Sequence, residues 1–240
     1  MAKNSLISWA DHTFNFWIGC SKVSEGCAHC YAERDFAKRG KWADCWGQDG
    51  KRKRTSDENW EQPWRWSTAA LRAGRRDTVF GQSLGDLFED HSAVGKWRAH
   101  AFLMMRQTTG LDWLLLTKRI ENVERMVPEL WKRPGMWPTN VWLGFSASTQ
   151  ATFDQRAALA EGLRGRYWVP IVFASLGPLL EGIDVTRHVS WDMGRSTSGP
   201  TLDWVIVEGE SGPEARTMQL RAVRQIRDAC VMAGVPFHFK

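Results

Sequence analysis

The chain has 240 residues, of which 43% are hydrophobic and 25% are charged, so it is long enough for one large domain with a substantial core. No run of about 18 apolar residues occurs, and the first residues lack the apolar stretch of a signal peptide, which argues against membrane-spanning and secreted proteins. We therefore expect a cytoplasmic protein without membrane contact. In that compartment clustered cysteines indicate metal binding or catalysis rather than disulfides.

The formal charge is +5, and the chain holds 15 Trp but only 2 Tyr. A basic surface rich in Trp can bind nucleic acid through phosphate contacts and base stacking. The same composition is also typical of a protein whose Trp side chains fill the core. Composition therefore leaves nucleic-acid binding open.

Short apolar runs recur along the chain and are rich in β-branched and aromatic residues, as strands buried on both faces are. Amphipathic helical patterns separate most of them. The predicted strands are residues 14–19, 78–83, 112–117, 140–146, 170–175, 203–209 and 236–240, and the helical stripes cover 94–105, 120–130, 153–163 and 220–230.

Alternating strands and helices predict an α/β fold with a parallel sheet and right-handed crossovers. We expect a complete or partial parallel (βα) barrel of about six to seven strands, with an open doubly wound sheet as the alternative. One domain would then span residues 1–240. In either fold the ligand site lies at the carboxyl ends of the strands. The segments expected to converge there are 83–90, 117–119, 145–149, 175–182 and 208–216.

Residues 40–76 do not fit the strand and helix pattern, because they are polar, rich in Trp and strongly basic. Within them a basic run at 51–54 precedes three tryptophans, Trp60, Trp64 and Trp66. We interpret this segment as an insertion. It is either a surface loop with packed Trp side chains or an arm that binds nucleic acid through residues 51–66.

Three cysteines, Cys20, Cys27 and Cys30, follow the first predicted strand. Three thiolates with one open position suit an iron–sulfur cluster that has a free iron. A fourth ligand would instead close a zinc site, and the candidates are His12, His29, Cys45 and His91. Spacing alone leaves both options open. Cys230 lies on the apolar stripe of the last predicted helix, so we expect a core thiol there.

Several motifs resemble those of the phage Gp37/Gp68 family, also described as a three-Cys-motif family. They are "SWADHTFNFWIGCSKVSEGCAHCYAER", "RTSDENWEQPWRW", "SLGDLFED", "LLLTKR", "NVWLGFSAST", "VIVEGESGPEAR" and "AGVPFHFK", and they cover nearly the whole chain. That family in turn resembles radical S-adenosylmethionine (SAM) enzymes, which are βα barrels with a three-cysteine loop after the first strand.

The resemblance implies a [4Fe–4S] cluster on Cys20, Cys27 and Cys30 whose free iron binds SAM, together with an electron donor that reduces the cluster. In that class, electron transfer cleaves a carbon–sulfur bond of SAM, and the radical formed abstracts hydrogen from a substrate.

The sequence also departs from these patterns. The cysteines are spaced C-x6-C-x2-C, where the radical SAM loop usually reads C-x3-C-x2-C. Gly177 stands where relatives tend to have Glu, and Glu208 stands where they tend to have Gly. A carboxylate has thus moved from one strand end to the next.

Polar residues at the other strand ends are candidates for holding SAM. Asp86 could accept from its amino group, unless it caps a helix, and Glu208 and Glu210 could bind a cation, unless they pair with Arg216 or Lys118. Ser146 and Ser148 could bond the ribose or carboxylate, unless they cap a helix. Gly209 and Ser211 offer backbone N–H groups in a tight turn. Lys118 and Arg119 are the candidates for binding an anionic substrate.

These patterns support two functions from different classes. The first is a SAM-dependent radical enzyme that acts on an unknown, possibly nucleic-acid-related substrate. The second is a zinc-binding protein that binds nucleic acid without radical chemistry.

Overall fold

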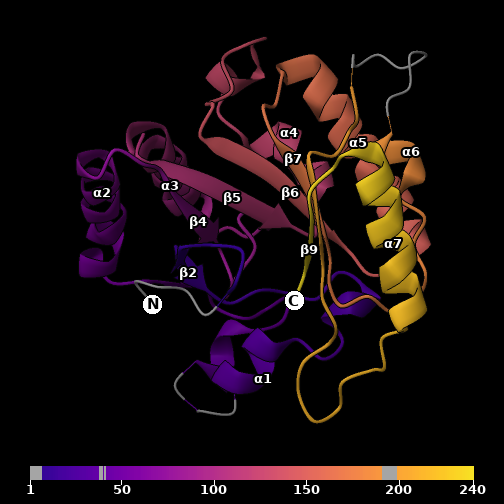
Figure 1. Ribbon diagram of the computed structural model, residues 1–240. Coiled ribbons are helices and arrows are strands. Elements are labelled where there is room, and N and C mark those ends of the chain that lie inside the picture. Colours follow the sequence, from indigo (N-terminus) through magenta and orange to yellow (C-terminus); the bar gives the residue numbers. More distant parts are fainter. Residues whose placement is uncertain (1–6, 38–39, 41, 191–198) are drawn as a thin grey trace.

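The computed structural model describes residues 7–37, 40, 42–190 and 199–240. Its main feature is a parallel sheet of seven strands in the order β1-β4-β5-β6-β7-β8-β9 (Figure 1). Their bounds are β1 His12–Phe14, β4 Asp77–Gly81, β5 Leu111–Thr117, β6 Val141–Ala147, β7 Val172–Leu176, β8 Trp204–Val207 and β9 Phe237–Phe239. Among the described residues β1 and β9 form the two edges, so the expected barrel is partial, and the α/β fold class is confirmed.

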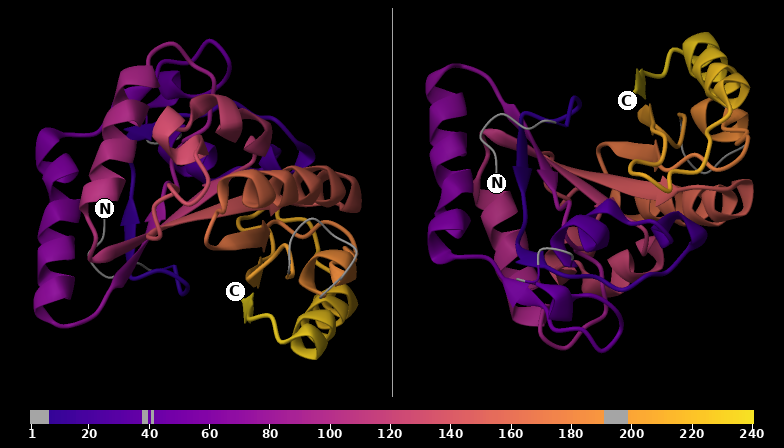
Figure 2. Two further views of the ribbon diagram at one scale, coloured as in Figure 1. Left: turned by 90° about the horizontal axis from the view of Figure 1, so that it is seen from above. Right: turned by 90° about the horizontal axis from the view of Figure 1, so that it is seen from below.

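The sheet curls, and its main helices lie around the outer face (Figure 2). These helices are α2 Asp57–Arg72, α3 Gly95–Gln107, α5 Gln150–Tyr167 and α7 Leu220–Ala233. Three shorter helices complete the set, α1 Tyr31–Ala37, α4 Val123–Met126 and α6 Thr186–Val189. Helix α1 lies apart from the outer layer, below the sheet in Figure 1.

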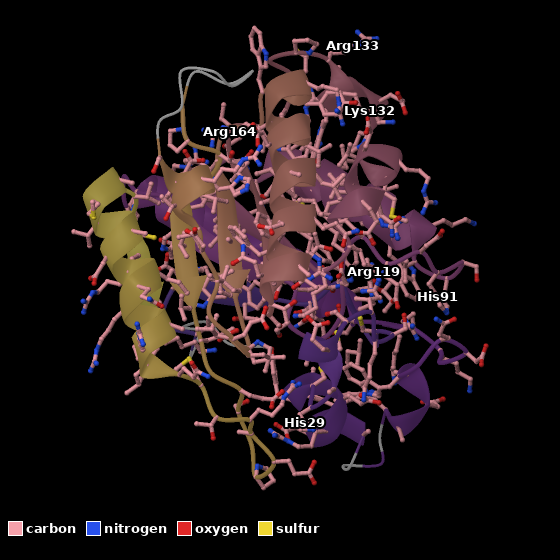
Figure 3. All side chains as sticks on the ribbon, turned by 90° about the vertical axis from the view of Figure 1, so that its right-hand side faces the viewer. His29, His91, Arg119, Lys132, Arg133 and Arg164 are labelled. Atoms are coloured by element: carbon pink, nitrogen blue, oxygen red, sulfur yellow. The ribbon has the colours of Figure 1, made fainter. Side chains whose placement is uncertain are left out.

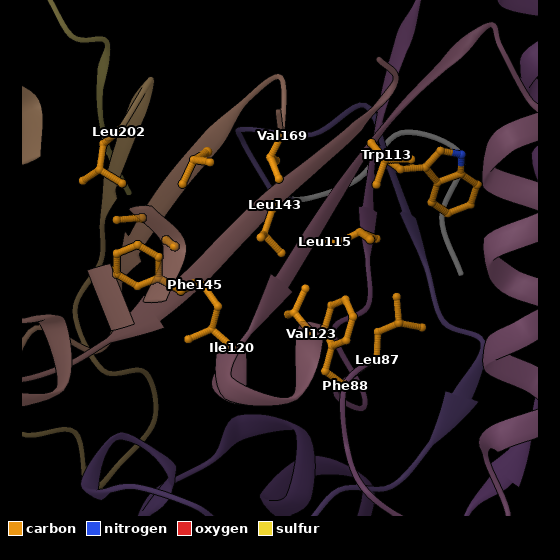
Figure 4. Packing of buried hydrophobic residues seen from close by; sticks show 14 of the residues in the cluster. Leu87, Phe88, Trp113, Leu115, Ile120, Val123, Leu143, Phe145, Val169 and Leu202 are labelled. Atoms are coloured by element: carbon orange, nitrogen blue, oxygen red, sulfur yellow. The ribbon is translucent and has the colours of Figure 1, made fainter. Parts of the chain in front are cut away.

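The largest core lies between the outer face of the sheet and these helices. Every second residue of a strand points to that face, so Trp113 and Leu115 of β5 pack there beside Leu143 and Phe145 of β6 (Figure 4). Cys230 of α7 is fully buried in this core, as its helical stripe predicted. Burial on this scale dominates the stability of the fold.

The alternate residues of the strands form a second, smaller cluster on the inner face. Phe80, Leu114, Phe173 and Ile206 pack there with Trp9, which precedes β1. The rings of Trp9 and Phe80 lie 4.6 Å apart between centroids. Both faces of the sheet are thus covered, which explains why the strands are apolar throughout.

The predicted first strand at 14–19 is wrong in its bounds. Strand β1 is His12–Phe14, and the chain then leaves the sheet. Strand β2, Trp17–Ile18, pairs antiparallel with β3, Lys53–Arg54, from the basic run. The predicted strand at 14–19 is therefore divided between two sheets. This division depends on pairing with residues far along the chain.

The segment 40–76 is not a long loop, because much of it forms the 16-residue helix α2. Ser56 caps this helix by accepting a hydrogen bond from the backbone N–H of Asn59. Trp60 and Trp66 are buried on its inner face, whereas Trp64 is 42% exposed.

The helix predicted over 120–130 is shorter than expected. The structure has a 3-10 turn at Ile120–Asn122, the four-residue α4, and another 3-10 turn at Glu129–Lys132. Pro128 ends α4, because the residue before a proline is forced into extended backbone, and Val127 has ψ 153°. No helix of the described residues is long and apolar enough to cross a membrane.

Candidate functional site

The three clustered cysteines come together at the carboxyl edge of the sheet. Cys20, Cys27 and Cys30 all line one cavity of about 150 Å³, called the cysteine cavity here. They are free and partly exposed, in contrast to the buried Cys45 and Cys230. The sequence thus gathers three accessible thiols on one concave surface.

The environments of two of these thiols differ. Burial raises the pKa of Cys20 to about 12, although the nearby Arg119 guanidinium opposes the shift. Burial also acts to raise the pKa of Cys27, but the Lys118 ammonium and backbone hydrogen bonds at Val23 and Ser24 lower it overall. A bound cation would hold both sulfurs as thiolates.

A buried charge network supports the cysteine loop. Arg119, 5% exposed, donates from Nη1 to Asp86 at 3.1 Å and to the Cys20 sulfur at 3.4 Å. Its Nη2 donates to the carbonyl of Ser21 at 2.6 Å and lies 3.5 Å from Glu89. Figure 3 shows Arg119 among the other side chains inside the molecule.

Arg52 extends this network into the basic insertion. Its Nε donates to Glu89 at 2.7 Å, and both side chains are almost completely buried. Its Nη1 and Nη2 donate to backbone carbonyls of the loop before β3, at residues 45, 47, 50 and 51. Glu89 also accepts from the backbone N–H and hydroxyl of Ser21. Two loops are therefore tied together beneath the cysteines.

Asp86 lines the cysteine cavity and also belongs to the same network. Its carboxylate accepts from the Thr117 hydroxyl at 2.7 Å and from the backbone N–H groups of Lys118 and Phe88 at 3.0 Å each. With Arg119 as a fourth donor the carboxylate is well satisfied. That Asp86 accepts from SAM stays a prediction, and such a ligand would share the carboxylate with these four donors.

Lys118 and Arg119, the two residues expected to bind an anionic substrate, differ in their surroundings. Both residues line the cysteine cavity, but Arg119 is held by the buried network, whereas Lys118 also lines a second cavity beside it. Arg119 therefore has a structural role in this network, and binding of an anionic substrate by either residue stays a prediction. Lys118 is the member of the pair that still faces open space.

The second cavity, about 430 Å³, is called the turn cavity here because the "GES" turn lines it. The predicted residues Glu208, Gly209, Glu210 and Ser211 all belong to its wall. Cys30 lines both cavities and so marks where they adjoin.

The two serines at the end of β6 differ in position. Ser146 lines the cysteine cavity and donates to the carbonyl of Gly177 at 3.2 Å. Ser148 lies under the cysteine loop, where a Cβ atom on Gly26 would approach its hydroxyl oxygen to 2.2 Å. Thr149, and not either serine, caps α5 by accepting from the backbone N–H of Thr152.

Each of the paired glutamates has a cationic partner. Glu210 accepts from the backbone and side chain of Arg216 and lies 3.1 Å from His29, and the Arg216 hydrogen bond lowers the pKa of Glu210 to about 2. Glu208 accepts from Lys240 at 2.9 Å. Glu210 thus pairs with Arg216, which was the alternative to cation binding.

The residues of the cysteine cavity fit a ligand that accepts hydrogen bonds. Gln82 is 3% exposed, and its Nε2 has no hydrogen-bond partner among the described residues. A Cβ atom on Gly85, which also lines the cavity, would lie 2.7 Å from this nitrogen. An N–H donor buried at a thiol-lined cavity matches a cluster or the ligand that it holds, because sulfide and carboxylate both accept.

The four candidate fourth ligands for zinc have other partners or positions. His29 lines the turn cavity with Cys30 but pairs with Glu210, and His91 accepts from the backbone N–H of Ala93. His12 stacks on Trp66 at 4.3 Å in the core, and Cys45 is buried. In the described part of the chain no three His, Cys, Asp or Glu side chains gather to hold one metal ion. A cluster makes a different demand, because each cysteine binds a separate iron.

Sequence reasoning missed Gln82, Lys240 and the Arg52–Glu89 pair. Lys240 follows β9, so the rule that ligand sites lie at the carboxyl ends of parallel strands could have included it. Nothing local distinguishes Arg52 within "KRKR" or Gln82 within an apolar run. Their roles come from partners that are distant in sequence.

The fold is an α/β partial barrel with three cysteines at the carboxyl edge of its sheet. A family model described as "Protein of unknown function (DUF5131)" matches residues 4–240, and the chain belongs to this family. No curated protein matches the chain. Membership of the phage Gp37/Gp68 family stays a prediction.

Solved structures show the fold likeness. A cysteine-to-serine mutant of spore photoproduct lyase matches with a TM-score of 0.57 and 12% identity, over 99% of this chain and 78% of that one. A second mutant, solved with dinucleoside spore photoproduct, matches with a TM-score of 0.57 and 11% identity over the same shares. A radical SAM methyltransferase from Sphaerobacter thermophilus matches with a TM-score of 0.51 and 15% identity, over 95% of this chain and 65% of that one.

Proposed function

We propose that the protein is an iron–sulfur enzyme of the radical SAM kind. The observation that carries this proposal is the meeting of Cys20, Cys27 and Cys30 on one cavity at the carboxyl edge of a partial parallel barrel. The three thiols would hold a [4Fe–4S] cluster. Such a cluster would supply the electron that cleaves a carbon–sulfur bond of SAM, and an external donor would reduce it.

The turn cavity is the proposed place for SAM. It adjoins the cysteine cavity at Cys30, and it is lined by a turn whose backbone can approach a ligand closely. Glu208 is the better acceptor for the SAM ammonium, because Glu210 already accepts from Arg216 and lies beside His29. A bound ammonium would replace Lys240 as the partner of Glu208.

The remaining cavity residues would position the substrate. Lys118 supplies a positive charge, and the inner-face aromatics Trp9 and Phe80 supply an apolar wall. This arrangement suits an anionic substrate with an apolar part.

Nucleic acid remains a proposed partner, but fewer residues of the segment 51–66 are available to bind it. Trp60 and Trp66 are buried, and Arg52 is paired inside the protein, so these residues do not offer a binding surface. Lys51, Lys53 and Trp64 remain exposed. If they contact phosphate, K51S/K53S makes the negative slope of log affinity against log salt less steep.

Anaerobic reconstitution tests the cluster. We expect about four iron and four sulfide per chain, and 5′-deoxyadenosine after reduction with SAM. C20A, C27A and C30A should each lose the cluster, while C45A and C230A, which alter buried thiols outside the cavity, should keep it. Stoichiometric zinc without iron uptake would contradict the proposal and favour the zinc protein.

A further inference from the structure

We infer that Arg119 is a positioning residue for the cluster, which fixes the Cys20 arm and raises the midpoint reduction potential through its hydrogen bond to the Cys20 sulfur. The inference rests on the proposed function, because it needs a cluster on Cys20. It assigns to Arg119 a role other than substrate binding.

Arg119 is buried, and it contacts the cysteine loop from the interior of the protein. Nη1 donates to the Cys20 sulfur at 3.4 Å and to Asp86, and Nη2 donates to the carbonyl and hydroxyl of Ser21 at 2.6 and 2.9 Å. One planar guanidinium thereby holds a ligand sulfur and the backbone next to it in a fixed relation. A lysine ammonium, with a single nitrogen, cannot span these acceptors.

The charges of the network determine the sign of the effect. Arg119 and Arg52 balance Asp86 and Glu89, so the network is neutral as a whole. Without Arg119 one buried negative charge is left uncompensated beside Cys20. Adding an electron to the cluster then becomes less favourable, and loss of the N–H donor at the sulfur acts in the same direction.

Arg98 provides a matched control. It is also a buried arginine, 9% exposed against 5% for Arg119, and it donates to carbonyls of the loop that carries Asp86 and Glu89, at Leu87 and Glu89. No hydrogen bond joins it to a cysteine among the described contacts. A variant at Arg98 therefore disturbs the loop without removing a donor from the sulfur.

The experiment compares reconstituted R119K, R119Q and R98K with the parent protein. Iron and sulfide content, circular dichroism and a redox titration followed by electron paramagnetic resonance are measured for each. We expect R119K and R119Q to shift the midpoint potential to more negative values, with the larger shift in R119Q because the charge is also lost. R98K should keep the potential of the parent.

Two results would overturn the inference. One is an unchanged potential in Arg119 variants that carry a full cluster, and the other is an equal shift in R98K. If the parent itself takes up no cluster, the proposed function fails instead, so the two failures are distinguishable.

The parent protein gives a second test that needs no variant. After labelling with ¹⁵N-arginine, pulsed electron paramagnetic resonance of the reduced cluster should show a weak ¹⁵N coupling from a guanidinium next to a ligand sulfur. Absence of this coupling in a fully loaded sample would also overturn the inference. This test holds even if the Arg119 variants fail to fold.

Discussion

Among single residues, Glu208 and Gly177 are a complementary pair. A Cβ atom on Gly177 would approach Cγ of Glu208 to 2.4 Å, so the Glu208 side chain fills the space of a side chain at 177. Both residues line both cavities. The carboxylate that the sequence moves from one strand end to the next therefore reaches nearly the same place.

A swap of the pair tests this complementarity. G177E should lose about 1–3 kcal/mol of stability, because a second side chain enters filled space. E208G should relieve that loss, giving a favourable coupling on the order of 1 kcal/mol in the double variant G177E/E208G. Urea unfolding of the parent, both single variants and the double variant measures the coupling. Strictly additive changes would contradict the shared space.

Asp77, which lies near the first strand, makes the stability of the protein depend on pH. Its carboxylate accepts from Arg75 at 2.7 Å and lies 3.2 Å from His12, and the Arg75 hydrogen bond lowers the pKa of Asp77. A carboxyl whose pKa is lower in the folded state stabilises above its unfolded pKa, about 3.9. It loses that contribution as the pH falls through the folded pKa.

We expect D77N to cost about 1–3 kcal/mol at pH 7, as for loss of a hydrogen bond to charged partners. The difference from the parent should shrink below about pH 4, where Asp77 becomes protonated. Urea unfolding of the cluster-free protein between pH 7 and pH 3 measures it. R75Q should lose most of the same pH-dependent difference, and a constant gap at all pH values would refute the argument.

At the level of elements, the β2–β3 pair connects the cysteine loop to the insertion. Strand β3 carries Lys53 and Arg54, and Arg52 directly before it enters the buried network with Glu89. Arg54 pairs with Asp57 and lies 4.4 Å over the Trp60 ring. The basic run is therefore divided between structural and exposed residues.

This division predicts unequal costs within one run of four basic residues. R52A should cost about 3–5 kcal/mol, because it leaves Glu89 buried with one arginine fewer. K53S changes an exposed residue and should stay within about 0.5 kcal/mol of the parent. Urea unfolding compares the two. An R52A variant as stable as K53S would show that the buried pair contributes little.

For the whole molecule, the curled sheet brings the ends of all its strands toward one edge, where the two cavities lie. Residues 190 positions apart, such as Cys20 and Glu210, thereby belong to adjoining cavities. That residues 1–240 form one domain stays a prediction.

SAM should stabilise the loaded protein more than the cluster-free protein, since the free iron would supply part of its binding. A ligand that binds only the folded state adds ~2.7 kcal/mol at a hundredfold excess over Kd. The Tm of the reconstituted protein, measured anaerobically with and without SAM, tests this. The cluster-free variant C27A is the control, and equal shifts in both proteins would count against an iron-held ligand.

Local patterns were enough to predict much of the architecture. Strands such as β5 and β6 are apolar on both faces because both faces are covered. A segment of seven residues is enough to show this pattern in the sequence. The rule that ligands bind at the carboxyl ends of parallel strands predicted that Lys118, Ser146 and Glu210 converge, and the structure places them on two adjoining cavities. The three cysteines were visible from their spacing alone.

Contacts between distant residues decided the rest. Lys118 and Arg119 are neighbours with similar charge, yet Lys118 lines both cavities, whereas Arg119 lines one of them and donates to Cys20, 99 positions away. Asp86 is satisfied by donors at 117–119, and Arg52 by Glu89. A sequence pattern states which groups need partners, but the partner is fixed only when the sheet curls and the loops meet. That is why the chemistry of each charged residue required the folded structure.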